Sequence, residues 1–292
     1  MCRLFGMHAG PKPVTATFWL LTAPDSLAEQ SRRMADGFGL GVFDSDGKPV
    51  VDKAPMPAYE DRAYASAART LKGTTFIAHV RYASTGEDTL VNTHPFLQDG
   101  RLLAHNGVVE DLDKLDDRLR SLEVMDLVKG QTDSERVFAL ITGLARQNGG
   151  DLGEAITEAI TWIAENLRLY AVNLVITTDT ELWAVRYPDT HPLYVLQESA
   201  DDPHRGKRSA RISVKSDEME QLQTPAVMVA TERMDENPNW RMMDAGEILR
   251  VDKDLNTERF FPLPQHPQHL LTLADLDPHT AASQHPLKVA GT

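Results

Sequence analysis

The single cysteine of this 292-residue sequence is its second residue. One cysteine can form neither an intramolecular disulfide nor a thiolate cluster for zinc, so its strong chemical uses are as a nucleophile or a redox-sensitive thiol. Lone cysteines are also often inert buried hydrophobes, and position alone favours neither interpretation. If Met1 is removed, Cys2 carries a thiol and a free α-amine, whose pKa of about 7.7 to 8.0 suits it to act as general base for its own side chain.

Four clusters of polar and charged residues lie within the first 135 residues. Taken singly, each has a structural explanation, such as a satisfied core histidine, a turn, a structural ion pair, or a carboxylate favoured by the dipole at a helix start. The clusters are Met1-Cys2-Arg3, His79-Val80-Arg81-Tyr82-Ala83-Ser84-Thr85-Gly86, Asn92-Thr93-His94-Pro95-Phe96 with His105-Asn106-Gly107, and Thr132-Asp133-Ser134-Glu135.

Together the clusters supply what amide hydrolysis requires. Attack on an amide carbonyl creates an oxyanion that needs two hydrogen-bond donors, and Asn106 and Gly107 offer a side-chain amide and a backbone N–H. A substrate with a free amino-acid end also needs a guanidinium for its carboxylate and a carboxylate for its ammonium. Arg81 and Asp133 are of these types.

These motifs occur in the order and approximate spacing of the class II, N-terminal-nucleophile (Ntn) glutamine amidotransferases, which the sequence resembles. The resemblance is strong over residues 1–145 and extends to about residue 255. It implies an α+β fold, the four-layer αββα sandwich of Ntn hydrolases. It also implies hydrolysis of the glutamine γ-amide through a Cys2 thioester, releasing glutamate and ammonia, with no cofactor and no metal.

The resemblance also implies roles for individual residues. Cys2 is expected to be the nucleophile, with its amine as the base, and Asn106 and Gly107 are expected to form the oxyanion hole. Substrate binding falls to four residues: Arg81 for the α-carboxylate, Asp133 for the α-ammonium, Ser84 as a substrate-contacting hydroxyl, and His94 as support for the pocket. Thr85 replaces a histidine that sugar-synthesising members carry.

The elements that must position these residues can be predicted from hydrophobic periodicity. Two groups of strands enclose a run of helices, and this order favours an α+β layered domain. Strands are expected at residues 2–9, 37–44, 48–53, 74–84, 102–105, 171–178, 181–186, 193–196, 226–231 and 247–251, and helices at 64–72, 112–122, 132–144 and 152–167.

The composition indicates an ordinary globular protein, with 25% charged and 41% hydrophobic residues. A net charge of −13 disfavours nucleic-acid or anionic-membrane partners, and the basic stretch at 199–215 is expected to be a solvated loop. No apolar run reaches the roughly 20 residues of a membrane span, and no signal peptide is evident. A cytoplasmic enzyme for a small-molecule substrate is therefore expected.

Residues 1–255 are expected to form the hydrolase domain and residues 256–292 a C-terminal arm or tail rich in Pro, Gln and His. The tail histidines lack the spacing of a metal site. Relatives with fused synthase domains continue beyond the glutaminase domain. The expectation here is therefore a stand-alone enzyme that acts alone or delivers ammonia to a separate synthase, and a homo-oligomer is compatible with the sequence.

Two alternatives remain open. The segments 36–39 and 230–240 are similar to stand-alone bacterial members, which include the ergothioneine-pathway hydrolase of a larger γ-glutamyl amide. Such an enzyme would share the residues that bind the γ-glutamyl half and differ in the leaving amine. The other alternative is a non-catalytic binding module on the same fold.

Overall fold

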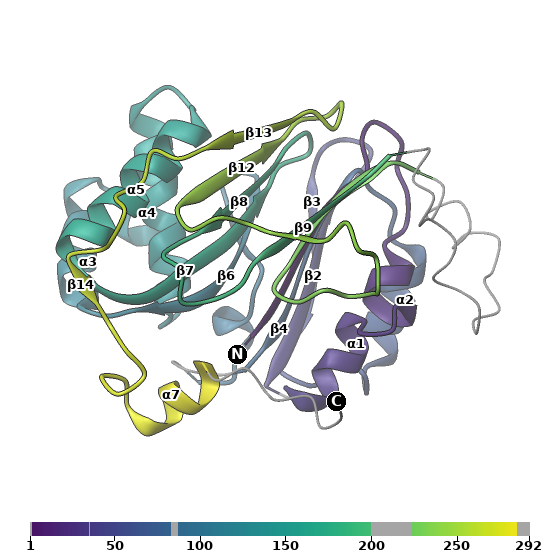
Figure 1. Ribbon diagram of the computed structural model, residues 1–292, viewed down its shortest axis with the longest axis horizontal. Coiled ribbons are helices and arrows are strands. Elements are labelled where there is room, and N and C mark those ends of the chain that lie inside the picture. Colours follow the sequence, from purple (N-terminus) through teal and green to yellow (C-terminus); the bar gives the residue numbers. More distant parts are fainter. Residues whose placement is uncertain (1, 35, 83–86, 200–223, 285–292) are drawn as a thin grey trace.

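Two β-sheets lie face to face, and helices cover the outer face of each (Figure 1). The computed structural model describes residues 2–34, 36–82, 87–199 and 224–284. Within these residues the layers follow the order helix, sheet, sheet, helix. This arrangement is the predicted four-layer αββα sandwich, and the α+β fold class is confirmed.

The first sheet carries the N-terminus in its centre. Its strands, in spatial order, are β11 (Arg241–Met242), β9 (Tyr194–Glu198), β10 (Ala226–Ala230), β1 (Arg3–His8), β4 (Thr75–Arg81), β2 (Gly37–Phe43) and β3 (Pro49–Ala54). Its outer face packs against the π-helical turn η1 (Phe18–Thr22), α1 (Leu27–Gln30), η2 (Ser31–Arg33) and α2 (Arg62–Thr70). Because β1 is central and pairs with both β4 and β10, the strand that directly follows Cys2 is held on both sides.

The second sheet lies under the larger helical layer. Its strands, in spatial order, are β13 (Thr257–Phe260), β12 (Glu247–Val251), β8 (Leu182–Arg186), β7 (Arg168–Thr177), β6 (Arg101–Val109) and β5 (Phe96–Gln98), with β14 (His269–Leu270) pairing β7 in parallel. The outer layer consists of α3 (Leu112–Ser121), α4 (Asp133–Gln147) and α5 (Leu152–Asn166), and short 3-10 turns lie at η3 (Leu90–Asn92) and η4 (Met125–Leu127).

Strand β6 contributes side chains to two hydrophobic cores, one on each face of its sheet. Leu102 and Ala104 belong to the core between the sheets, whereas Leu103 and Val109 belong to the core under α4 and α5. Successive side chains of a strand point to opposite faces, so a nearly continuous apolar run is required where both faces are buried. Alternate apolar side chains of one strand therefore hold its sheet against the other sheet on one face and against the helices on the other face.

The predicted arm begins within the second sheet. The expected boundary at residue 255 falls inside a hairpin in which β13 pairs with β12, from Ile248 with Phe260 to Val251 with Thr257. Further along, α7 (Pro278–Gln284) buries three polar residues, and Gln284 Oε1 is 2.8 Å from His191 Nε2. The short strands and this helix lack apolar periodicity, which is why the sequence predicted an arm instead of ordered elements.

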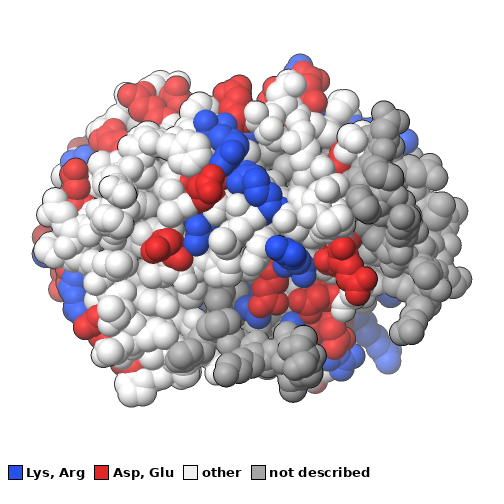
Figure 2. Space-filling view, in the orientation of Figure 1, with Lys and Arg blue, Asp and Glu red and all other residues white. Residues whose placement is uncertain are grey.

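The charged surface is mixed in sign. On the face shown in Figure 2, acidic and basic side chains are interspersed among uncharged ones. The basic stretch expected to form a loop, 199–215, lies outside the described residues except for its first residue. No helix within the described ranges is long and apolar enough to cross a membrane.

Candidate active site

A small cavity lies where β1, β4, β6 and the start of α4 converge. Its volume of about 20 Å³ is enough for roughly one water molecule. All four polar clusters of the sequence contribute to its lining, which comprises Cys2, His79, Arg81, Tyr82, Asn92, His94, His105, Gly107, Thr132, Asp133 and Ser134. The fold thus brings together residues up to 132 positions apart.

Five of the seven predicted site residues line this cavity: Cys2, Arg81, His94, Gly107 and Asp133. Asn106 is not a lining residue, although it lies on β6 between His105 and Gly107, which are. Ser84, and its neighbour Thr85, lie outside the described residues.

The Cys2 thiol is held by the backbone of Tyr82 just beyond the end of β4. Its Sγ donates to the Tyr82 carbonyl at 3.2 Å and accepts from the Tyr82 N–H at 3.2 Å. Burial raises the pKa of the thiol above its ordinary value, and the Tyr82 N–H and the cations of Arg81 and Arg3 oppose that rise. A thiol with a raised pKa is protonated at neutral pH, so it needs a base to become a nucleophile.

The Asn106-Gly107 pair lies where β6 approaches β7 closely. A Cβ on Gly107 would lie 1.9 Å from the Ala171 carbonyl oxygen, so this backbone position requires glycine. The Asn106 side chain is buried, and neither of its polar atoms has a hydrogen-bond partner within the described part of the chain. A buried, unpaired amide is costly to keep and is the kind of group that a substrate oxygen can satisfy.

Asp133 is the first residue of α4, and its orientation is fixed by the backbone. The Thr132 hydroxyl caps the helix by accepting from the Glu135 N–H at 3.2 Å. Asp133 Oδ2 accepts from the Val109 N–H at 2.9 Å, and Oδ1 accepts from the Ser134 N–H at 2.8 Å. The carboxylate is therefore held at the cavity with lone pairs left for a cation.

Arg81 ends β4, and its buried side chain forms an ion pair with Asp88. No pattern in the sequence pointed to Asp88 as its partner. Nor did the sequence show that Glu232 forms an ion pair with Arg3, the residue after the nucleophile. In both ion pairs the carboxylate lies in a loop, and hydrophobic periodicity does not predict which residue a loop side chain will contact.

Three histidines beside the cavity are kept neutral. The rings of His79 and His94 lie 4.1 Å apart, and His105 Nδ1 is 2.9 Å from Ser134 Oγ. Burial lowers the pKa of His79 to about 3 and lowers the pKa values of His94 and His105. At neutral pH these rings add no positive charge, and they are poor candidates for the base that Cys2 needs.

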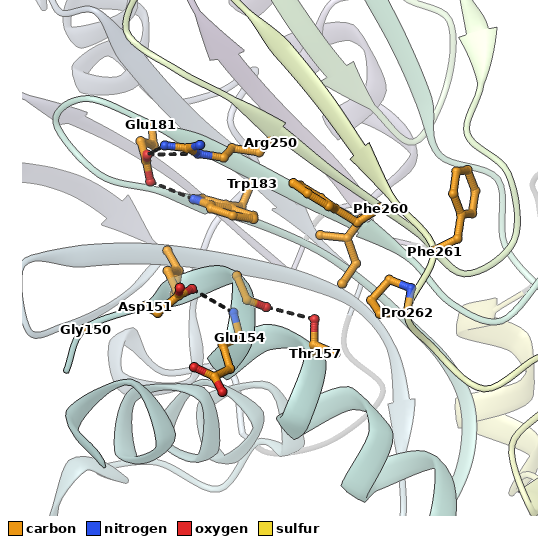
Figure 3. Close-up of a pocket in the computed structure, with 13 residues that line it drawn as sticks. Gly150, Asp151, Glu154, Thr157, Glu181, Trp183, Arg250, Phe260, Phe261 and Pro262 are labelled. Carbon is orange, nitrogen blue, oxygen red and sulfur yellow. Dashed lines mark hydrogen bonds and ion pairs between the residues drawn. The ribbon is translucent and has the colours of Figure 1, made fainter. Parts of the chain in front are cut away.

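A larger groove of about 740 Å³ lies away from this site (Figure 3). Trp183 and Phe260 form one wall, and the first turn of α5 with Asp151 forms the other. Helices α4 and α5 form a hairpin, so the start of α5 is about 22 Å, the length of 15 helical residues, from the start of α4. None of the predicted site residues lines this groove.

The described residues include no group of three or more His, Cys, Asp or Glu side chains placed to hold a metal ion.

This chain is similar to known proteins both in sequence and in three-dimensional structure. Two relatives were found by sequence. Glutamine–fructose-6-phosphate aminotransferase (isomerizing) of Escherichia coli K12 is 31% identical over 136 residues, which make up 47% of this chain and 22% of that protein. A probable glutamine amidotransferase of Saccharomyces cerevisiae is 28% identical over 170 residues, 52% of this chain and 47% of that protein. The match therefore spans less than half the length of either relative.

Solved structures share the fold at lower identity. A glutamine aminotransferase class-II domain protein from Silicibacter pomeroyi superposes with a TM-score of 0.59 at 19% identity, covering 90% of this chain and all of that one. Glutamine phosphoribosylpyrophosphate amidotransferase from B. subtilis gives a TM-score of 0.63 at 20% identity, covering 89% of this chain and 49% of that one.

The family model for class II glutamine amidotransferases matches residues 1–269, which include all four polar clusters. The match extends past residue 255 and through β13, in agreement with the continuation of the sheet. The chain therefore belongs to the class II glutamine amidotransferases, enzymes that hydrolyse the amide of glutamine.

Proposed function

We propose that this chain is a glutaminase that hydrolyses the γ-amide of free glutamine through a thioester on Cys2. The observation that carries the proposal is the shared cavity, which is lined by a thiol at residue 2, a guanidinium and a carboxylate. A separate synthase as acceptor of the ammonia, and the stand-alone organisation, form part of the same proposal.

In the proposed reaction the α-amine of the processed chain takes the proton from the Cys2 thiol, and Sγ attacks the amide carbon. The Asn106 side-chain amide and the Gly107 N–H stabilise the oxyanion. When the C–N bond breaks, the α-ammonium returns the proton to the leaving nitrogen, and ammonia departs. Water, deprotonated by the same amine, then attacks the thioester, and glutamate leaves with the thiol restored.

Arg81 and Asp133 are proposed to hold the two ends of the amino-acid moiety. Arg81 is buried on β4 and suits a bidentate carboxylate. Asp133 is fixed by two backbone N–H groups and suits an ammonium. The His94 ring lies beside that of His79, and His94 is proposed to support the pocket wall. Ser84 is proposed as a further hydroxyl contact. The catalytic unit is proposed to include β13, with the remainder to residue 292 as the arm.

The test is release of glutamate and ammonia from glutamine by protein that begins at Cys2. Cys2→Ala is expected to abolish release while the thermal unfolding midpoint changes little, because within the described residues the thiol forms hydrogen bonds to the Tyr82 backbone alone. A Cys2→Ala protein as active as the wild type would refute the proposal. A wild type with a correctly processed N-terminus that hydrolyses neither glutamine nor a larger γ-glutamyl amide would favour the non-catalytic module.

A larger γ-glutamyl amide as substrate is the second candidate. The segment that resembles the ergothioneine-pathway hydrolase contributes Glu232, which pairs with Arg3 directly after the nucleophile. This segment therefore lies next to the residue that follows the nucleophile, and it is proposed to contact a larger leaving amine. A panel of γ-glutamyl amides compared by kcat/KM separates the candidates, and preference for free glutamine would reject the second one.

A further inference from the structure

Arg81 already has a carboxylate of the protein on its guanidinium. Asp88 Oδ1 forms an ion pair with Arg81 Nη1. The Arg81 side chain is 4% exposed, whereas the Asp88 side chain is 54% exposed. A guanidinium buried to this extent is stabilised by charge-assisted hydrogen bonds, and the Asp88 carboxylate accepts one of them.

The backbone that carries Asp88 is tied to the loop that begins α4. The Asn92 side-chain amide donates to the Glu87 carbonyl at 3.1 Å, and its oxygen accepts from the Gln131 N–H at 2.8 Å. Glu87 N–H also donates to Gln131 Oε1 at 3.3 Å. Gln131 immediately precedes the Thr132 cap, so these bonds run from the Arg81 side of the cavity to the Asp133 side.

The cavity has to widen for any ligand of substrate size, with or without an α-carboxylate. Its volume of about 20 Å³ suits roughly one water molecule, far less than the ten non-hydrogen atoms of glutamine require. Arg81 is fixed within β4 between β1 and β2. Asp88, being half-exposed and outside any helix or strand, can turn toward solvent at little cost in packing.

We propose that Asp88 is a positioning residue that mimics the substrate. Its carboxylate occupies the subsite of the α-carboxylate and holds Arg81 in place until glutamine displaces it. The inference rests on the proposed role of Arg81. It implies that substrates with an α-carboxylate compete with Asp88, whereas an analogue without one leaves the Arg81–Asp88 pair undisturbed.

The experiment compares Asp88→Asn and Asp88→Ala with Glu87→Gln, a control that removes the adjacent exposed carboxylate. KM for glutamine is expected to fall about fivefold in both Asp88 variants, equivalent to about 1 kcal/mol for a half-exposed ion pair, with kcat within twofold of wild type. The inhibition constant of 4-aminobutanamide, which is glutamine without its α-carboxylate, is expected to stay the same. Glu87→Gln is expected to behave as wild type.

An unchanged or raised KM in both Asp88 variants would overturn the inference, as would an equal fall in KM in Glu87→Gln. Equal changes for glutamine and 4-aminobutanamide would also overturn it, because only glutamine competes for Arg81. Failure of the proposed function is distinguishable, since a wild-type enzyme that does not hydrolyse glutamine fails before any variant is compared.

Discussion

Two asparagines face each other across the β6–β7 ladder and are expected to do different work. Asn106 pairs in register with Asn173. The Asn173 side chain donates to the His191 and Pro192 carbonyls and accepts from the Tyr187 N–H, whereas the Asn106 amide has no partner within the described residues. An amide that the fold leaves unpaired is available to the reaction.

Asn106→Ala is therefore expected to lower kcat by about 10² to 10³-fold, the usual effect of removing one oxyanion donor, with little change in KM. The unfolding midpoint should change little, because the Asn106 side chain forms no hydrogen bond to any residue that the structure describes. Asn173→Ala is the matched control and should cost about 1–3 kcal/mol of stability for its unpaired partners while retaining kcat. Steady-state kinetics measure kcat and KM of both variants, and thermal melts measure their stability. An Asn106→Ala variant with the kcat of wild type would refute the oxyanion role of Asn106.

At this scale the sequence predicted residue types better than contacts. Cys2, Arg81, His94, Gly107 and Asp133 line one cavity, as their grouping into motifs indicated. The Tyr82 backbone as the holder of the thiol, and Asp88 as the partner of Arg81, could not be predicted. Backbone groups carry no sequence signature, and exposed carboxylates pair with whichever cation a loop brings near.

Helices α4 and α5 lie in the same layer, begin at opposite ends of it, and have equivalent N-terminal caps. Thr132 caps α4 by accepting from Glu135 N–H, and Asp151 caps α5 by accepting from Glu154 N–H at 2.9 Å (Figure 3). Only the first turn of α4 carries a site residue, Asp133. Comparing the loss of the two caps therefore distinguishes an effect on helix stability, which both share, from an effect on substrate binding, which only the α4 cap is expected to have.

Thr132→Ala and Asp151→Ala should each lower the free energy of unfolding by about 1 kcal/mol, the usual cost of a lost cap. Only Thr132→Ala is expected to raise KM for glutamine, by severalfold, because the turn that orients Asp133 loosens. Urea unfolding and glutamine kinetics on both variants test this expectation. An equal rise in KM in Asp151→Ala would show that the effect is global.

Long elements could be predicted and short ones could not. The strands of both sheets with apolar runs, and the helices α3, α4 and α5, lie within a few residues of their expected positions. Strands β5, β13 and β14 have two to four residues each, too few to show alternation. They form because a neighbouring strand offers unpaired backbone groups, which is a property of the folded sheet.

For the whole molecule, the buried histidines predict sensitivity to acid. His79, His94 and His105 are neutral in the folded protein because burial lowers their pKa values, that of His79 to about 3. In the unfolded chain a histidine binds a proton below about pH 6.5. The stability from these residues is therefore complete above that pH and is lost as the pH falls toward the folded-state pKa values.

Between pH 7 and pH 5 the protein is expected to lose about 2 kcal/mol of unfolding free energy through His79, and His94 and His105 act in the same direction. His79→Asn should lower stability at pH 7 but reduce the loss on acidification by about that amount. His266→Asn removes an exposed histidine and should leave the loss unchanged. Urea unfolding at both pH values measures the loss of unfolding free energy. A wild-type protein of equal stability at pH 7 and pH 5 would contradict the conclusion that these histidines are buried in the neutral form.

The central claim, that Cys2 is the N-terminal nucleophile for a γ-glutamyl substrate, is tested most directly by trapping the nucleophile. The native protein is treated with a glutamine-analogue electrophile and digested, and its N-terminal peptide is analysed by mass spectrometry. The expected result is one adduct per chain, on Cys2 of a peptide that begins at that residue, with protection by excess glutamine and no adduct in Cys2→Ala. An active enzyme that retains Met1, or an adduct that persists in Cys2→Ala, would contradict the account.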